Sequence, residues 1–111
     1  MDHDRFAQLV EESLRQLPKK FRRRLTNVAI MVEDYPSRSQ ERGLLLGLFH
    51  GVPLTEKSTF YAGLPDRIVI YQKNIETLCQ DEQEIRRQIR DTLLHELGHY
   101  FGMREEELSD V

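Results

Sequence analysis

The sequence has little of what secreted and membrane-spanning proteins need. It contains one cysteine, Cys79, so no disulfide can form within the chain, whereas secreted domains of this size often carry several. No basic segment followed by an apolar run opens it, so no signal peptide is expected. Its longest nearly uncharged stretch, 43–55, is interrupted by glycine and proline and is shorter than the roughly 20 apolar residues that span a bilayer. We therefore expect a cytoplasmic protein without a membrane partner.

A large excess of charge of either sign is also missing. The net charge is −3 at neutral pH, which gives no electrostatic reason to expect a nucleic-acid partner. One basic cluster follows Pro18, and the helical spacing of Phe21 and Leu25 within it predicts the solvated face of a short helix. The cluster consists of Lys19, Lys20, Arg22, Arg23 and Arg24.

The size and composition are those of one ordinary globular domain. A chain of 111 residues, of which 39% are hydrophobic and 32% charged, can bury a single modest core. No internal repeat, low-complexity tract or linker is present. We expect residues 1–111 to form one domain. The sequence does not indicate its oligomeric state.

Helical patterns occupy both ends of the chain. In residues 4–17 apolar side chains recur every three or four positions, which is typical of a helix that packs one stripe against a core. A longer helix is predicted to begin at Asp81, which is a good N-cap with Glu84 at the capping-box spacing, and to stop at Gly102. A helix of about 20 residues extends roughly 30 Å, enough to cross the domain.

Three short stretches between these helices have the composition of strands. Residues 26–33 are almost continuously apolar, which predicts burial on both faces. Residues 44–49 lie between glycines, although their leucines leave a helix possible, and residues 66–71 are rich in β-branched side chains. The expected fold class is α+β, with N-terminal helices, a small mixed sheet and a long C-terminal helix packed on it.

The long helix contains the sequence HELGH. His95 and His99 are four residues apart, so both imidazoles lie on one face of the helix and can reach one zinc ion at about 2.0–2.1 Å. On a helical wheel they fall outside the apolar arc, beside Gln88 and Thr92. Glu96 can accept a proton from a water that such an ion acidifies. These groups together are suited to the hydrolysis of an amide.

A catalytic zinc ion needs a third protein ligand. Gly102 can turn the chain sharply after the helix, and the acidic residues Glu105, Glu106 and Glu107 follow at once. Elsewhere, His50 is interpreted as a surface or supporting residue at the end of a strand. Three tyrosines could stabilise an oxyanion, and their spacing selects none of them: Tyr61, Tyr71 and Tyr100.

The segment HELGHYFGM, followed by REEEL, resembles the active-site segment of a bacterial family of minimal zincin-like metallopeptidases. The pattern of that family is H-E-x-G-H-x-x-G with an acidic residue three places after the last glycine. Residues 44–54 and 65–76 also resemble the family. The resemblance implies a zincin-like fold and one Zn²⁺ per chain.

Carried over residue by residue, the resemblance implies that His95 and His99 are zinc ligands, that Glu96 is the general base and that Glu105 is the third ligand. Relatives often have aspartate at the position of Glu105. Because glutamate reaches further, Glu106 or Asp110 remains an alternative third ligand.

The predicted function is a zinc-dependent metallopeptidase that acts on an extended peptide or an unfolded protein, which could add as a strand beside the sheet. One alternative is a non-catalytic metal-binding or regulatory module, whose site would be closed by four protein ligands. Another is a metal-dependent endoribonuclease of a family with a similar His-xxx-His helix. That family has a third histidine and lacks the glutamate beside the first.

Overall fold

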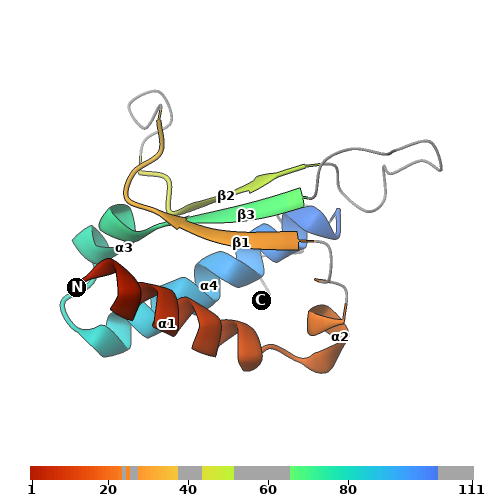
Figure 1. Cartoon of the computed structure of the whole chain (residues 1–111), viewed down its shortest axis with the longest axis horizontal. Coiled ribbons are helices and arrows are strands. Elements are labelled where there is room, and N and C mark those ends of the chain that lie inside the picture. Colours follow the sequence, from red (N-terminus) through yellow and green to blue (C-terminus); the bar gives the residue numbers. More distant parts are fainter. Residues whose placement is uncertain (24, 26–27, 38–43, 52–65, 103–111) are drawn as a thin grey trace.

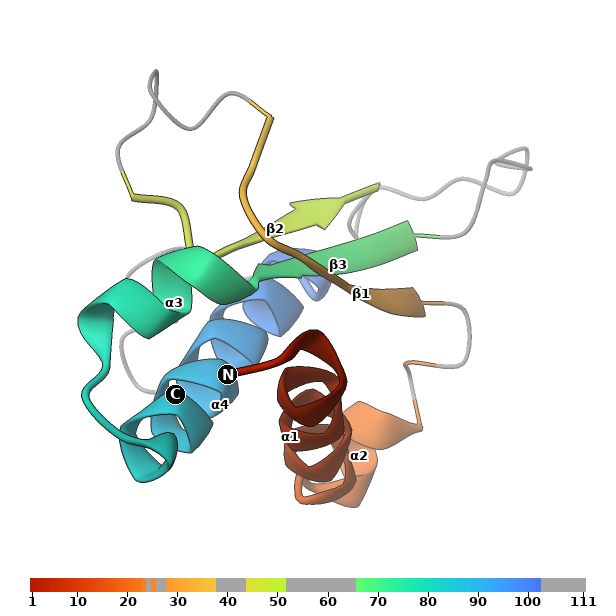
Figure 2. The ribbon, with the colours of Figure 1, turned by 60° about the vertical axis from the view of Figure 1, so that its left-hand side comes forward.

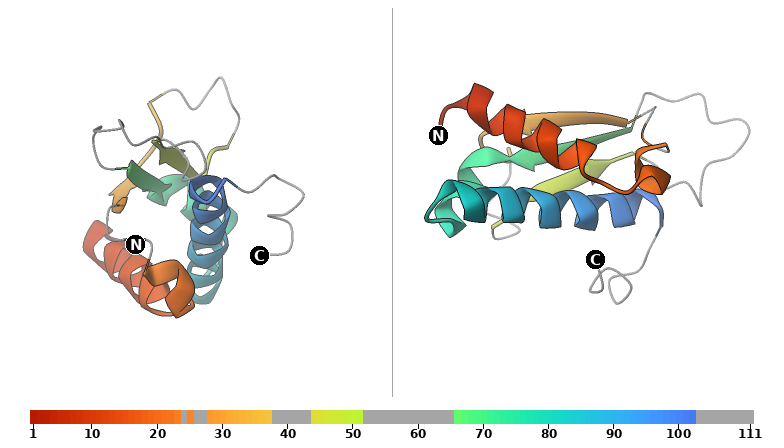
Figure 3. Two further views of the ribbon diagram at one scale, coloured as in Figure 1. Left: turned by 90° about the vertical axis from the view of Figure 1, so that its right-hand side faces the viewer. Right: turned by 90° about the horizontal axis from the view of Figure 1, so that it is seen from below.

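The computed structural model describes residues 1–23, 25, 28–37, 44–51 and 66–102. A three-stranded sheet forms one layer, and helices α1 and α4 lie side by side on one face of it (Figures 1 and 3). This arrangement confirms the predicted small α+β fold with a long C-terminal helix. In chain order the elements are α1 (His3–Arg15), α2 (Lys19–Arg22), β1 (Val28–Glu33), β2 (Gly47–His50), β3 (Asp66–Tyr71), α3 (Gln72–Leu78) and α4 (Glu82–Tyr100).

The ends of α4 form where the sequence predicts them. The Asp81 carboxylate accepts a hydrogen bond from the Glu84 backbone N–H at 2.8 Å, and the Glu84 carboxylate accepts one from the Gln80 N–H at 2.8 Å. These bonds satisfy N–H groups that have no partner within the helix. At the other end Gly102 has a φ of 76°, a conformation that costs glycine little. Within the described residues, no helix is long and apolar enough to cross a membrane.

The sheet has the strand order β1-β3-β2, with β1 parallel and β2 antiparallel to β3. The central strand supplies Ile68 and Ile70 to the core, and both are fully buried. They pack with apolar side chains of α1 and α4 in one cluster, which includes Phe6, Leu9, Val10, Ile89, Leu93 and Leu97. The core therefore lies between the sheet and the two long helices.

The prediction that residues 26–33 are buried on both faces is wrong for the strand that forms there. Along β1 half-buried and exposed residues alternate, and the side chain of Met31 is 39% exposed. The reason is that α1 and α4 lie on one face of the sheet, so alternate side chains of β1 point away from them (Figure 3). Residues 26 and 27 lie outside the described part of the chain.

Two further elements differ from the sequence-based expectation. The second strand begins at Gly47 and ends at His50, so it starts three residues later than the predicted stretch 44–49. Helix α3 follows β3 without a break, and its polar start gave no signal of a helix. The short helix α2 does follow Pro18, and the described basic residues of the cluster, Lys19, Lys20, Arg22 and Arg23, are exposed on it or just after it.

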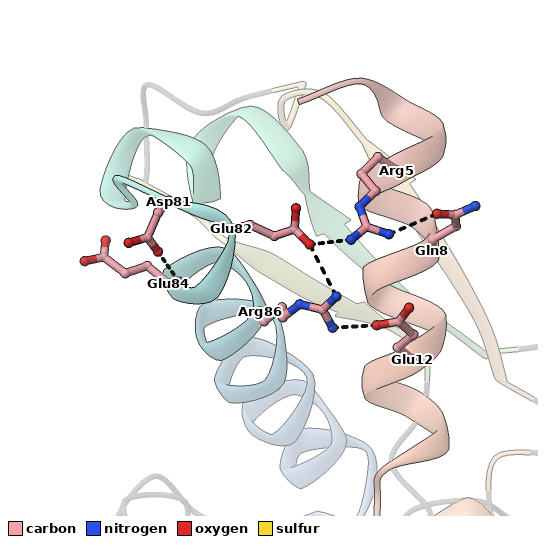
Figure 4. A network of polar contacts seen from close by, with 7 residues as sticks. All are labelled: Arg5, Gln8, Glu12, Asp81, Glu82, Glu84 and Arg86. Carbon is pink, nitrogen blue, oxygen red and sulfur yellow. Dashed lines mark hydrogen bonds and ion pairs between the residues drawn. The ribbon is translucent and has the colours of Figure 1, made fainter.

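A network of charged side chains joins α1 to the first turns of α4 (Figure 4). Arg5 donates to the Glu82 carboxylate, and Arg86 donates to Glu12 and, at 3.3 Å, to Glu82. The hydrogen bond from Arg5 is the largest cause that holds the pKa of Glu82 below its usual range. The hydrogen bond with Glu12 raises the pKa of Arg86. These contacts fix the position of the N-terminal half of α4.

We expect Glu82→Gln to destabilise the fold at neutral pH but not in acid. Because the pKa of Glu82 is lowered in the folded protein, its contribution is present above the pKa of an unfolded glutamate and is lost as the pH falls through the lowered value. Urea unfolding of both proteins at pH 7 and near pH 3 measures the difference. Glu11→Gln, at an exposed carboxylate paired with Arg15, is the control. A difference that persists undiminished in acid would contradict the prediction.

Candidate metal centre

The two predicted ligands lie together on the C-terminal half of α4. The imidazole rings of His95 and His99 have their centroids 4.9 Å apart and are inclined at 74° to one another. Both residues are half-buried. With the Glu96 carboxylate they form a group whose ligand atoms all lie within 4.8 Å of one another. Such a group could hold a divalent metal ion.

Glu96 is held between the helix and the sheet. Its side chain is largely buried, with the residue 7% exposed, and its Oε1 accepts a hydrogen bond from the backbone N–H of Phe49 at 2.9 Å. Phe49 belongs to β2, which lies at the edge of the sheet beside α4 (Figure 2). The bond therefore fixes the carboxylate beside the two imidazoles.

Gly47 allows β2 to approach α4 at this point. A Cβ atom at residue 47 would lie 2.6 Å from the Cγ2 atom of Thr92, 3.1 Å from the carbonyl oxygen of Val69 and 3.4 Å from the Cγ atom of Glu96. The first of these distances is far below van der Waals contact. A glycine inside a strand often marks such a close approach. Here it brings the edge strand against the face of the helix that carries Glu96.

We expect Gly47→Ala to destabilise the protein by about 1–3 kcal/mol, since the added methyl group has no space. Urea unfolding measures the loss. Thr92→Ser removes the Cγ2 atom that the new Cβ would meet and keeps a hydroxyl for Gln88, so it should restore part of the stability in the double variant. Equal losses with threonine and with serine at position 92 would show that this contact is not the cause.

A cleft of about 370 Å³ opens beside the histidines. One wall is the chain that enters β2, and the other is the face of α4 from Gln88 to Glu96. The described residues that line it are Leu45, Leu46, Gly47, Gln88, Asp91, Thr92, His95 and Glu96. The group of possible metal ligands is therefore reached from a solvent-accessible hollow along the helix.

Two other residues singled out in the sequence, Tyr71 and His50, belong to the sheet. Alternation along β3 places Tyr71 on the face opposite Ile68 and Ile70, which pack toward the helices. Burial, and then the nearby Glu33 carboxylate, raise the pKa of Tyr71. His50 is the last residue of β2 and pairs with Arg67, so it shares the face of Tyr71. The Glu96 carboxylate also contributes, more weakly, to the raised pKa of Tyr71, so the charge of the group reaches this tyrosine.

Tyr100 is a further tyrosine near the site. It is 3% exposed, and its ring packs against that of Phe49 with centroids 5.6 Å apart. Four predicted residues lie outside the described part of the chain: Tyr61, Glu105, Glu106 and Asp110. The third ligand thus stays a prediction.

Two contributors to the site were not found by sequence reasoning. One is the backbone N–H of Phe49, which no side-chain pattern can reveal. The other is Gly47, whose position in a leucine-rich stretch was a usable signal of close backbone approach. Both belong to the edge strand, so the site is a joint product of α4 and β2.

Known proteins resemble this chain in sequence and in structure. The sequence model of the zincin-like metallopeptidases matches residues 25–111. The chain belongs to this family. The zincin-like chain is also similar to a solved structure, that of a conserved hypothetical protein from Thermo thermophilus, with 26% identity, 98% of each chain covered and a TM-score of 0.64. No curated protein shows significant similarity to it.

Membership of the family implies a metal ion, typically zinc, and the donors of this zincin-like site fit one. Two donors bound to the same zinc ion at about 2.1 Å each lie at most about 4.2 Å apart. The group around His95 and His99 spans at most 4.8 Å, so side-chain rotations that move the donors by less than about 1 Å bring it within that limit. Because both imidazoles are only half-buried beside the cleft, an ion bound by them would be accessible to substrate.

Proposed function

We propose that this protein is a zinc-dependent metallopeptidase. The observation that carries the proposal is the group formed by His95, Glu96 and His99, in which two half-buried imidazoles adjoin one buried, oriented carboxylate. A module with a purely structural ion has no need of a fixed acid beside its ligands. Amide hydrolysis needs one, because a proton must leave the attacking water and reach the departing amine.

In the proposed site one Zn²⁺ per chain is held by His95, His99 and a carboxylate after the helix, which we assign to Glu105. Glu106 and Asp110 are the alternatives. When bound, the ion supplies a Lewis acid that acidifies water and polarises a carbonyl oxygen. Three protein ligands would leave a position open for substrate, as catalytic zinc sites require.

Glu96 acts as the general base in this proposal. Its Oε1 is fixed by the Phe49 N–H at 2.9 Å, and a carboxylate has a second oxygen with which to accept a proton. Burial of the residue at 7% exposure excludes most competing water. The chain thereby holds the base in one orientation before substrate arrives, which lowers the cost of reaching the transition state.

The edge of β2 offers a binding place for an extended peptide. The Leu46 carbonyl oxygen accepts a hydrogen bond from the Tyr71 N–H at 2.9 Å, so Leu46 and, by alternation, Leu48 turn their backbone groups toward β3. Gly47 and Phe49 then turn theirs to the outer edge, where the Phe49 N–H meets Glu96. Because Glu96 occupies that N–H, an extended peptide or an unfolded protein could pair as an additional strand with the other outward groups, those of Gly47 and the carbonyl of Phe49. We propose neither a nucleic-acid nor a membrane partner.

The test uses tag-free protein, since a polyhistidine tag would bind metal itself. Elemental analysis should find about one zinc per chain, and zinc-loaded protein should cleave unfolded polypeptides at internal bonds, detected by mass spectrometry. Chelation should stop cleavage and zinc should restore it. Failure to bind zinc would overturn the proposal. Stoichiometric zinc without cleavage of any peptide would favour the non-catalytic module, and cleavage of RNA alone would favour the nuclease.

A further inference from the structure

We infer that the cleft beside His95 is a subsite for a cationic side chain of the substrate, that of lysine or arginine. The inference rests on the proposed peptidase function and adds the class of residue that the enzyme selects. It depends on three features of the described chain: the shape of the cleft, the charges of the residues that line it and the closeness of Asp91 to His95.

The cleft has the shape of a slot for one long side chain. It runs along α4 between the helix and residues 45–47, and its volume is about 370 Å³, at the low end of the range for ligand pockets. Leu45, Leu46 and the backbone at Gly47 form an apolar wall. Such a wall suits the methylene stem of lysine or arginine, which packs on apolar surface while the charged head stays hydrated.

Apart from the ion that His95 would hold, the charges of the slot are of one sign. Among its described lining residues the carboxylates are Asp91 and Glu96, and neither lysine nor arginine is present. A glutamate or aspartate side chain of a substrate would meet like charge there, whereas a cation would be attracted. An apolar side chain would fill the slot but would make no favourable interaction with these carboxylates. The walls therefore favour a cationic side chain.

Asp91 is the carboxylate available to such a cation. Glu96 already accepts the Phe49 N–H, whereas Asp91 is exposed and its carboxylate makes no ion pair or hydrogen bond within the described part of the chain. Asp91 precedes His95 by four residues, so the two side chains are neighbours on one face of α4, with Cβ atoms about 5–6 Å apart. A side chain whose head meets Asp91 thus belongs to a substrate residue close to the bond that is cleaved.

The test compares matched peptides in which one residue near the cleaved bond is arginine, lysine, leucine or glutamate. For zinc-loaded protein we expect kcat/KM to be about fivefold to tenfold higher with arginine or lysine than with glutamate. Asp91→Asn should remove the preference, Asp91→Glu should keep it and Asp91→Lys should reverse it. Added salt should weaken it. Glu11→Gln removes another exposed carboxylate, on α1, and is the control.

Binding is measured in parallel, as the dissociation constant of the same peptides for zinc-loaded Glu96→Gln with and without Asp91→Asn. Cleavage without a charge preference, or a preference that survives Asp91→Asn, would overturn the inference and leave the peptidase function standing. If no peptide is cleaved but arginine peptides bind more tightly through Asp91, the peptidase function fails and the cationic subsite is upheld.

Discussion

Glu96→Gln is expected to lower peptide hydrolysis by at least about 10²- to 10⁴-fold, the usual contribution of a general base, and to leave zinc bound. Glutamine has the size of glutamate and keeps a carbonyl oxygen, so the hydrogen bond from the Phe49 N–H at 2.9 Å can persist. What the amide cannot do is accept a proton from water. The measurement is kcat/KM together with the zinc content of the same preparation.

Glu82→Gln is the matched control for that variant, because it makes the same change on the same helix, at an exposed side chain in the network with Arg5 and Arg86. Although it lowers the stability, it should keep full activity at neutral pH when the assay temperature lies well below its Tm. Should Glu96→Gln retain hydrolysis within a few-fold of the unchanged protein while zinc stays bound, another group must take the proton, and the role proposed for Glu96 would be wrong.

The parts of the site that the sequence predicted are those that one helix determines by itself. The spacing of His95 and His99 puts their rings together whatever the rest of the fold does, because residues four apart share a helical face. Asp81, Glu84 and Gly102 likewise act within one turn of the ends of α4. Local signals of this kind are readable without knowledge of the tertiary structure.

The parts that sequence reasoning missed depend on distant contacts. Whether an apolar strand is buried on both faces is decided by what covers each face, and α1 and α4 both lie on one face of the sheet that contains β1. The start of β2 at Gly47 is fixed by its pairing with Ile70 and its approach to Thr92. The same approach lets Phe49 reach Glu96 across 47 positions of sequence. No periodicity in the sequence encodes these contacts.

The local contacts within α4 and the distant contacts with β2 both act on the Glu96 carboxylate. Helix α4 places Glu96 next to the imidazoles, and β2 fixes its orientation through one backbone N–H. A substrate strand on the outer edge of β2 would therefore be aligned by the same strand that orients the base. This connection gives a physical reason for a glycine at position 47, since any larger residue would separate the edge strand from the helix.

His95→Ala is expected to weaken zinc binding by at least about 10²-fold, because structural zinc sites with four ligands bind with roughly 10–16 kcal/mol, or about 3 kcal/mol per ligand. Hydrolysis should fall with the metal. A competitive chelator titration measures the affinity, and a thermal scan supplies a second reading, since zinc should raise the Tm of the unchanged protein but not of the variant. His50→Ala is the control, because His50 lies on the opposite face of the sheet. Equal losses in both variants, or unchanged affinity in His95→Ala, would show that the ion is held elsewhere.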